Sequence, residues 1–129
     1  MIVSNATCRE TSRVLVVEDH PGIALGLQAL LNSRGYTVRL ASCIEAALDE
    51  LECGSYGLVV ADFDLGDQDG LSLVRELRVK HPTIPVLAVT AVDRAEAAEA
   101  AAGLSVAECL EKPVDPELLI AAVARHLGP

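Results

Sequence analysis

Acidic residues follow two of the apolar segments of this chain, and they are the residues best suited to chemistry. Leu58–Ala61 leads into Asp62, and Val14–Val17 leads into Glu18 and Asp19. Short segments rich in Val and Leu are typical of strands buried on both faces, and open α/β sheets bind their ligands at the carboxyl ends of such strands. Carboxylates gathered there repel one another unless a cation neutralises them, and hard oxygen ligands suit Mg²⁺. The pattern therefore predicts a magnesium site.

Two further polar residues follow apolar segments later in the chain. They are Thr90, after an apolar run that begins at Ile84, and Lys112, after a run that begins at Val106. Beside a metal ion, an ammonium group neutralises phosphoryl oxygens and a hydroxyl group donates a hydrogen bond to them. The carboxylate of Asp62 can itself act as the nucleophile, as aspartyl-phosphate chemistry requires. Together these groups predict a phosphoryl-transfer site.

Five apolar segments alternate with five helical patterns, which is typical of a parallel sheet with helices on both faces. We expect strands at 13–18, 36–41, 58–62, 84–89 and 106–110. We expect helices near 21–34, 42–54 with a Ser42–Glu45 capping box, 70–80, 94–102, and 115–128 with Asp115 as its cap. The alanine-rich helix at 94–102 has little apolar surface to anchor it, so it is expected to be the most mobile helix.

Right-handed crossovers and short connections favour one arrangement of these elements. It is a flavodoxin-like (βα)5 fold, a doubly wound five-stranded parallel sheet with strand order 2-1-3-4-5 in a three-layer α/β/α architecture. The switch point of this order lies between strands one and three. Both acidic clusters would flank it, and Thr90 and Lys112 would lie at the same edge.

Composition limits the classes of function. The 129 residues suit one domain, expected at 13–128, after a flexible tail or linker at 1–12. A net charge of −9 argues against direct contact with nucleic acid. No apolar stretch approaches the ~20 residues of a membrane span, and no signal peptide is evident, so we expect a cytoplasmic domain without membrane contact. The cysteines (Cys8, Cys43, Cys53 and Cys109) lack metal-binding spacing and are expected to be reduced and buried.

The chain resembles the receiver domain of two-component response regulators over roughly residues 13–128. The resemblance implies that Glu18, Asp19, Asp62 and the backbone carbonyl of Asp64 bind Mg²⁺. It also implies that Asp62 is the phosphoacceptor, that Thr90 is the switch residue, and that Lys112 contacts the phosphoryl group. Lys112 precedes a proline, Pro113, and the peptide bond between these residues is typically cis in the family.

Two features depart from the usual receiver pattern. Cys109 stands where the family usually has Tyr or Phe, an aromatic ring that moves inward together with the switch Thr. We therefore expect phosphorylation to move mainly the segment 90–102, with little change at Cys109 and weak or no homodimer formation. The loop Asp64-Leu65-Gly66-Asp67 lacks the proline that many receivers have after the apolar residue, and this form resembles receivers on hybrid sensor kinases.

The expected function is that of a phosphoacceptor switch and not of a metabolic enzyme. A phosphohistidine on a sensor histidine kinase or histidine phosphotransfer protein would dock near Ile23 and Leu27 and donate to Asp62. The domain would promote only its own phosphorylation and autodephosphorylation. One alternative is a pseudo-receiver that acts only as a binding scaffold. The other is a haloacid-dehalogenase-like phosphohydrolase, because Asp62-Phe63-Asp64 imitates the nucleophile motif of those enzymes. Those enzymes need a cap or a further acidic motif beyond the Lys.

Overall fold

The computed structural model describes residues 13–65, 68–91, 99 and 103–127. Five parallel strands form one sheet: β1 (Arg13–Val17), β2 (Thr37–Ala41), β3 (Leu58–Asp62), β6 (Val86–Thr90) and β7 (Glu108–Glu111). Their order across the sheet is β2-β1-β3-β6-β7. This confirms the predicted doubly wound sheet, in which β6 and β7 are the fourth and fifth strands of the order 2-1-3-4-5.

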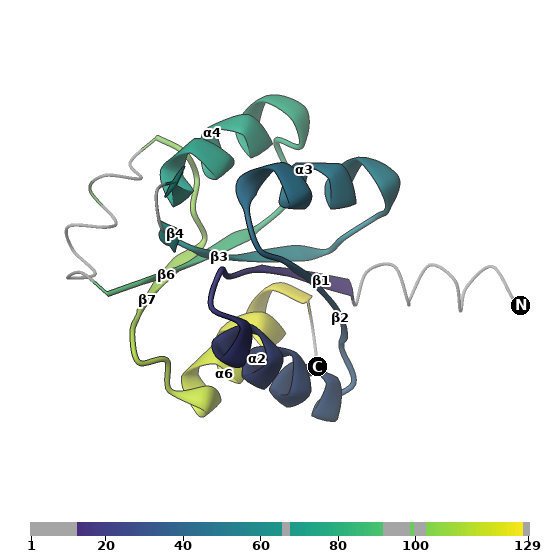
Figure 1. Ribbon diagram of the computed structural model, residues 1–129, viewed down its shortest axis with the longest axis vertical. Coiled ribbons are helices and arrows are strands. Elements are labelled where there is room, and N and C mark those ends of the chain that lie inside the picture. Colours follow the sequence, from purple (N-terminus) through teal and green to yellow (C-terminus); the bar gives the residue numbers. More distant parts are fainter. Residues whose placement is uncertain (1–12, 66–67, 92–98, 100–102, 128–129) are drawn as a thin grey trace, which may run out of the picture.

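Helices cover both faces of the sheet (Figure 1). The helices α2 (Pro21–Ser33) and α6 (Pro116–Leu127) lie on one face, and α3 (Ile44–Cys53) and α4 (Gly70–Lys80) lie on the other. The helix predicted at 94–102 falls outside the described residues except for Glu99. Within the described part of the chain, none of the helices is long and apolar enough to cross a membrane.

The core consists of two apolar layers, one on each face of the sheet. Val14 and Val16 belong to the layer that contains Leu31 of α2 and Leu119 of α6. Leu15 and Val17 belong to the layer that contains Leu51 of α3 and Leu77 of α4. Successive side chains of a strand point to opposite faces, so a strand covered on both faces needs apolar residues throughout. This accounts for the unbroken apolar run that precedes Glu18.

The expected strand bounds differ from the observed ones by up to two residues. β6 spans 86–90 where 84–89 was expected, and β7 spans 108–111 where 106–110 was expected. Ile84 and Val106 pack against the core without belonging to the strands, so apolar character extends beyond the hydrogen-bonded ladder. As a result, Thr90 is the last residue of β6 and not the first residue of the loop.

Helix caps agree with the sequence only in part. Asp115 caps α6, because its Oδ1 accepts the Glu117 N–H at 2.9 Å, as predicted. The capping box predicted at Ser42 is wrong. Cys43 is the cap of α3, and its Sγ accepts the Ala46 N–H at 3.5 Å. The helix starts at Ile44, one residue later than a Ser42 cap requires, so the thiol and not the hydroxyl group lies beside the free N–H groups.

Cysteine burial and one small sheet also differ from expectation. Cys43 and Cys109 are half-buried, but Cys53 is exposed, so its predicted burial is wrong; Cys8 lies outside the described residues. The three described cysteines form no disulfide. The strands β4 (Asp64–Leu65) and β5 (Gln68–Asp69) form an antiparallel pair after β3 that was expected only as a loop. Strands of two residues are too short to show a periodic pattern.

Candidate functional site

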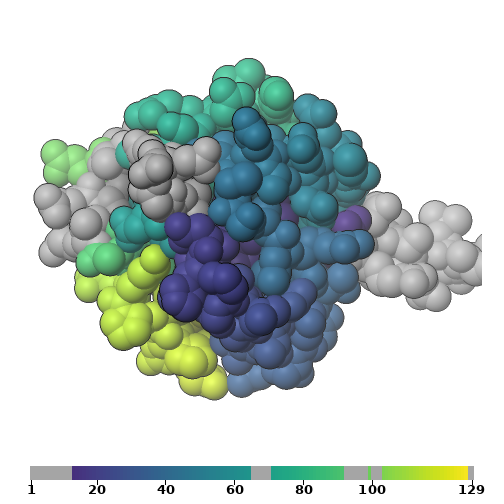
Figure 2. Space-filling model, in the orientation of Figure 1, coloured from purple at the N-terminus to yellow at the C-terminus, as the bar shows by residue number. Residues whose placement is uncertain are grey.

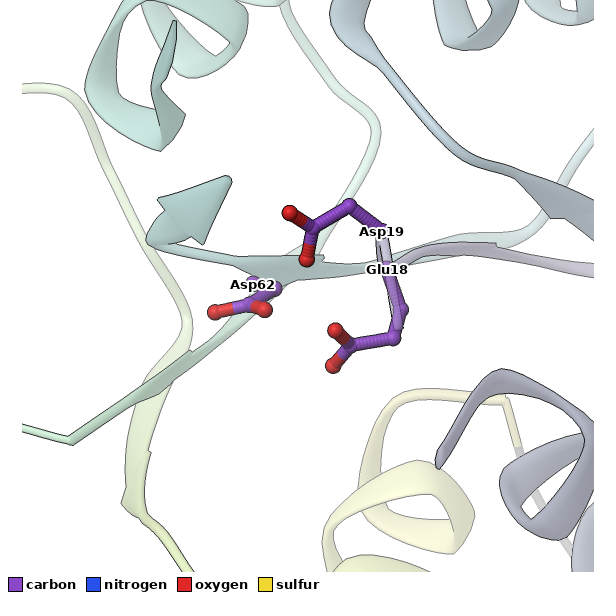
Figure 3. Close-up of side chains that lie close together, drawn as sticks. All are labelled: Glu18, Asp19 and Asp62. Carbon is purple, nitrogen blue, oxygen red and sulfur yellow. The ribbon is translucent and has the colours of Figure 1, made fainter. Parts of the chain in front are cut away.

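Three carboxylates meet at the carboxyl ends of β1 and β3. These strands are neighbours in the sheet, with Val17 paired to Ala61, so the residues that follow the pair come together. Glu18, Asp19 and Asp62 each offer an oxygen atom, and these three atoms lie within 4.8 Å of one another. Figure 3 shows the three side chains around one shared space. The predicted convergence of the two acidic clusters is confirmed.

Asp62 is held firmly on one side and is without a hydrogen-bond donor on the other. Its side chain is only 2% exposed. Its Oδ1 accepts the backbone N–H of Asp64 at 2.8 Å and lies 2.8 Å from Nζ of Lys112. Its Oδ2 is buried and has no hydrogen-bond partner among the described residues. A buried acceptor without a donor is costly, and a cation beside Glu18 and Asp19 would relieve that cost, so this group of oxygens fits a hard metal ion.

Lys112 brings the end of β7 to Asp62. Its backbone N–H donates to the carbonyl of Thr90 at 2.8 Å, and its bond to Pro113 is cis, as the resemblance implies. Partial burial by itself would lower the pKa of the Lys112 ammonium group. The hydrogen bond and charge of Asp62, with the charges of Glu18 and Asp64, outweigh this effect and raise the pKa. Lys112 therefore stays protonated at neutral pH.

Glu18 lies deeper than its neighbour Asp19. It is 5% exposed, whereas Asp19 is exposed. Burial raises the pKa of the Glu18 carboxyl to about 7, and the nearby Asp62 adds to the rise. The backbone N–H of His20, which donates to Oε2 of Glu18 at 3.1 Å, opposes the rise. A metal ion would oppose it further, since a bound cation favours the ionised carboxylate.

The two predicted switch residues lie on neighbouring strands. Thr90 is 1% exposed and ends β6, one residue beyond the pair of Val89 with Asp62. Cys109, on β7, pairs with Ala88 of β6. Ala88 is two residues before Thr90 on the same strand, so Cys109 and Thr90 belong to the same face of the sheet. Because Val89 packs toward α2 and α6, this face is the one covered by α3 and α4.

The side chain of Asp64 also belongs to the site, which sequence reasoning missed. Only its backbone carbonyl was expected to take part. Its Oδ2 accepts the backbone N–H of Ala91 at 2.9 Å and lies 3.8 Å from Nζ of Lys112. The partners are 27 and 48 residues away along the chain, and no short-range sequence signal indicates a contact of this kind.

A hollow of about 550 Å³ opens beside these residues, between α2 and α6. Figure 2 shows the start of α2 beside the first part of α6. Apolar side chains that include Ile23, Leu27 and Val114 line most of the hollow, and Glu18 and Lys112 lie at its polar end. The two residues predicted to contact the partner, Ile23 and Leu27, differ in exposure. Ile23 is 44% exposed, whereas Leu27 is half-buried against the core.

Comparison with known proteins identifies the family. Residues 14–124 match the family description "Response regulator receiver domain". The chain belongs to the response regulator receiver domain family. Receiver domains are signalling domains, and the five-stranded sheet of this one is shared by solved receivers. The structure of the receiver domain of Francisella response regulator 1452 superposes with a TM-score of 0.83 and 26% identity, covering 89% of this chain and 95% of that one.

Relatives of this receiver domain occur in more than one kind of protein. The transcriptional regulatory protein ZraR of Escherichia coli is 34% identical over 115 residues, which are 89% of this chain and 26% of that protein. The transcriptional activator protein ExaE of Pseudomonas putida is 36% identical, over 89% of this chain and 55% of that protein. A sensor protein from Polaromonas sp. JS666 has a TM-score of 0.82 and 33% identity, covering 89% of this chain and 94% of that chain. The chain spans about a quarter to a half of the length of the curated relatives.

Proposed function

We propose that this receiver domain accepts a phosphoryl group on Asp62 from a phosphohistidine of a sensor histidine kinase or histidine phosphotransfer protein. The observation that carries the proposal is the state of the Asp62 carboxylate. It is buried and held by Lys112 through Oδ1, while Oδ2 has no partner in the described part of the chain. An oxygen of Asp62 also lies within 4.8 Å of oxygens of two further carboxylates, Glu18 and Asp19. A structural aspartate would have both oxygens satisfied.

The transfer is a displacement at phosphorus. An oxygen of Asp62 forms a bond to phosphorus as the phosphorus–nitrogen bond of the phosphohistidine breaks, and the electron pair of that bond leaves with the imidazole ring. Lys112 is already 2.8 Å from Asp62, so its positive charge is in place before the phosphoryl oxygens arrive. Thr90, at the end of the neighbouring strand, supplies the hydroxyl group.

Glu18, Asp19 and Asp62 are the carboxylates that would hold Mg²⁺. The resemblance to receiver domains adds the backbone carbonyl of Asp64 to this set. When bound, the ion neutralises negative charge on the phosphoryl oxygens. Glu18 and Asp62 are both buried, so their charges are poorly screened in the metal-free protein. We therefore propose that phosphorylation requires the divalent ion. The domain promotes its own phosphorylation and autodephosphorylation.

The partner would approach across the start of α2. Ile23 is exposed and lines the hollow that reaches Glu18 and Lys112, so a helix bearing the phosphohistidine can contact it while its ring faces Asp62. We place the domain at 13–128, in the cytoplasm; the tail or linker expected at 1–12 lies outside the described residues. Its output lies in an attached domain or partner. The relatives are transcriptional regulators and a sensor protein, so contact with DNA would come from another domain and not from this acidic one.

Intact-mass analysis tests the proposal with acetyl phosphate as the phosphodonor. We expect the mass gain of one phosphoryl group in the presence of Mg²⁺, and none after metal chelation or in the Asp62→Asn variant. Asp49→Asn is the matched control, since Asp49 is an exposed aspartate of α3 that is not among the residues of the site. Equal uptake by the Asp62→Asn variant, or uptake without metal, would contradict the mechanism.

The scaffold alternative makes a different prediction in the same assay. A pseudo-receiver would bind its partner and take up no phosphoryl group from any donor. This alternative is disfavoured by the presence of Lys112, Thr90 and three converging carboxylates. Buried carboxylates that repel one another destabilise the fold, and binding a partner does not require them. The phosphohydrolase alternative is disfavoured by the match to the receiver family.

A further inference from the structure

The carboxylate of Asp64 occupies donors that a phosphoryl group on Asp62 would need. Its Oδ2 accepts the Ala91 N–H at 2.9 Å, and Lys112 lies 3.8 Å away. Asp64 is two residues beyond Asp62 and donates its own N–H to Oδ1 of Asp62 at 2.8 Å. The side chain thus connects the end of β3 to the residue that follows β6.

These contacts matter because a phosphoryl group brings three acceptor oxygens and about two negative charges. Among the described residues, Ala91 N–H and the Lys112 ammonium group are donors at the open end of the site, and both face the Asp64 carboxylate. A phosphoryl group on Asp62 would compete with Asp64 for them and would meet the negative charge of Asp64 at short range.

From this geometry we infer that the Asp64 carboxylate stands in for the phosphoryl group in the resting domain. It holds Ala91 and Lys112 in place and must release Ala91 when Asp62 is phosphorylated. Asp64 is in this sense a positioning residue that opposes phosphorylation. The inference rests on the proposed acceptor role of Asp62, and it concerns the side chain of Asp64, in addition to the proposed role of its backbone carbonyl.

The contact predicts a graded effect of two substitutions. Asp64→Ala removes both the charge and the acceptor, whereas Asp64→Asn keeps an oxygen acceptor and removes only the charge. With acetyl phosphate and Mg²⁺, we expect Asp64→Ala to be phosphorylated about five to ten times faster than the wild type. Asp64→Asn should lie between them. The concentration of beryllofluoride needed to saturate the site, with Mg²⁺ present, should fall in the same order.

A measurement on the resting protein tests the contact independently of phosphorylation. The amide proton resonance of Ala91, observed by NMR without metal or phosphodonor, should shift in Asp64→Ala and exchange faster with solvent, because its hydrogen bond is lost. Asp49→Asn removes the same charge from an exposed residue of α3 and should change neither the resonance nor the phosphorylation rate.

Several results would overturn the inference. One is an unchanged Ala91 resonance in Asp64→Ala. Another is phosphorylation of both Asp64 variants at the wild-type rate, or more slowly, while all three proteins are modified on Asp62. That second result would leave the proposed function standing. If neither the wild type nor the variants took up a phosphoryl group, the acceptor role of Asp62 would fail and the inference would fail with it.

Discussion

Replacing Glu18 with Gln should change how the stability of the metal-free protein depends on pH. Burial and the nearby Asp62 raise the pKa of Glu18 from 4.5 to about 7. The folded state therefore retains this proton over a pH range in which the unfolded chain has lost it. Since the folded state then binds more protons than the unfolded state, the free energy of unfolding falls as the pH rises through this range.

The size of the effect follows from the two pKa values. At about 1.4 kcal/mol per pH unit, the gap between 4.5 and about 7 corresponds to about 3 kcal/mol. The contribution is fully present below pH 4.5 and is lost above about pH 7. Gln has no proton to lose. The Glu18→Gln variant should therefore gain up to about 3 kcal/mol relative to the wild type between acidic and mildly alkaline pH.

Urea unfolding followed by far-ultraviolet circular dichroism measures this difference, because the chain has no tryptophan to serve as a fluorescent probe. Metal is removed by chelation, and Glu45→Gln, an exposed residue of α3, is the control. Saturating Mg²⁺ should restore stability to the wild type most strongly at high pH, since it binds the ionised carboxylate. A difference between wild type and Glu18→Gln that stays constant from about pH 5 to about pH 8 would refute the reasoning.

Three further predictions concern the ion pair, the partner surface and the switch. Lys112→Ala leaves Asp62 buried without its counterion and should lower the free energy of unfolding, measured with urea, by about 2 kcal/mol. If Lys112→Ala lowered it by as much in the Asp62→Asn variant, the loss would not come from the ion pair. Ile23→Asp should slow phosphorylation by a phosphohistidine donor about tenfold and leave the rate with acetyl phosphate unchanged. Leu25 is 59% exposed and outside the hollow, so Leu25→Asp should change neither rate. Equal slowing of the phosphohistidine reaction by both substitutions would exclude the docking surface. With Cys109 in place of an aromatic residue, beryllofluoride and Mg²⁺ should cause little or no dimerisation in sedimentation experiments, and strong dimerisation would show that the switch does not need the ring.

The parts of the fold that could be predicted from the sequence depend on pattern over many residues. The apolar runs before Glu18 and Asp62 indicated buried parallel strands, and the sheet order followed from short connections and crossover handedness. The carboxyl ends of neighbouring strands lie at one edge of the sheet, so the convergence of acids from two segments could be anticipated. The same argument placed Lys112 beside Asp62.

The remaining features depend on single atoms or on a shift of one residue. Ser42 and Cys43 are neighbours, and the start of α3 at Ile44, which no propensity fixes to one residue, decides which of them is the cap. The depth of Glu18 relative to Asp19 depends on how β1 ends, and the sequence shows only that both are acidic. The hydrogen bond between Asp64 and Ala91 joins a residue of β4 to the residue that follows β6, 27 positions further along the chain, and has no local signal.

The most direct test of the account is to locate the phosphoryl group on the chain. The protein is incubated with Mg²⁺ and a phosphohistidine donor, the acyl phosphate is reduced with borohydride, and the modified residue is identified by peptide mass spectrometry. We expect reduction of Asp62 alone to its alcohol, dependent on both the donor and the metal. Modification of another residue, or no modification under conditions in which a donor phosphorylates a known receiver, would contradict the claim that Asp62 is the phosphoacceptor.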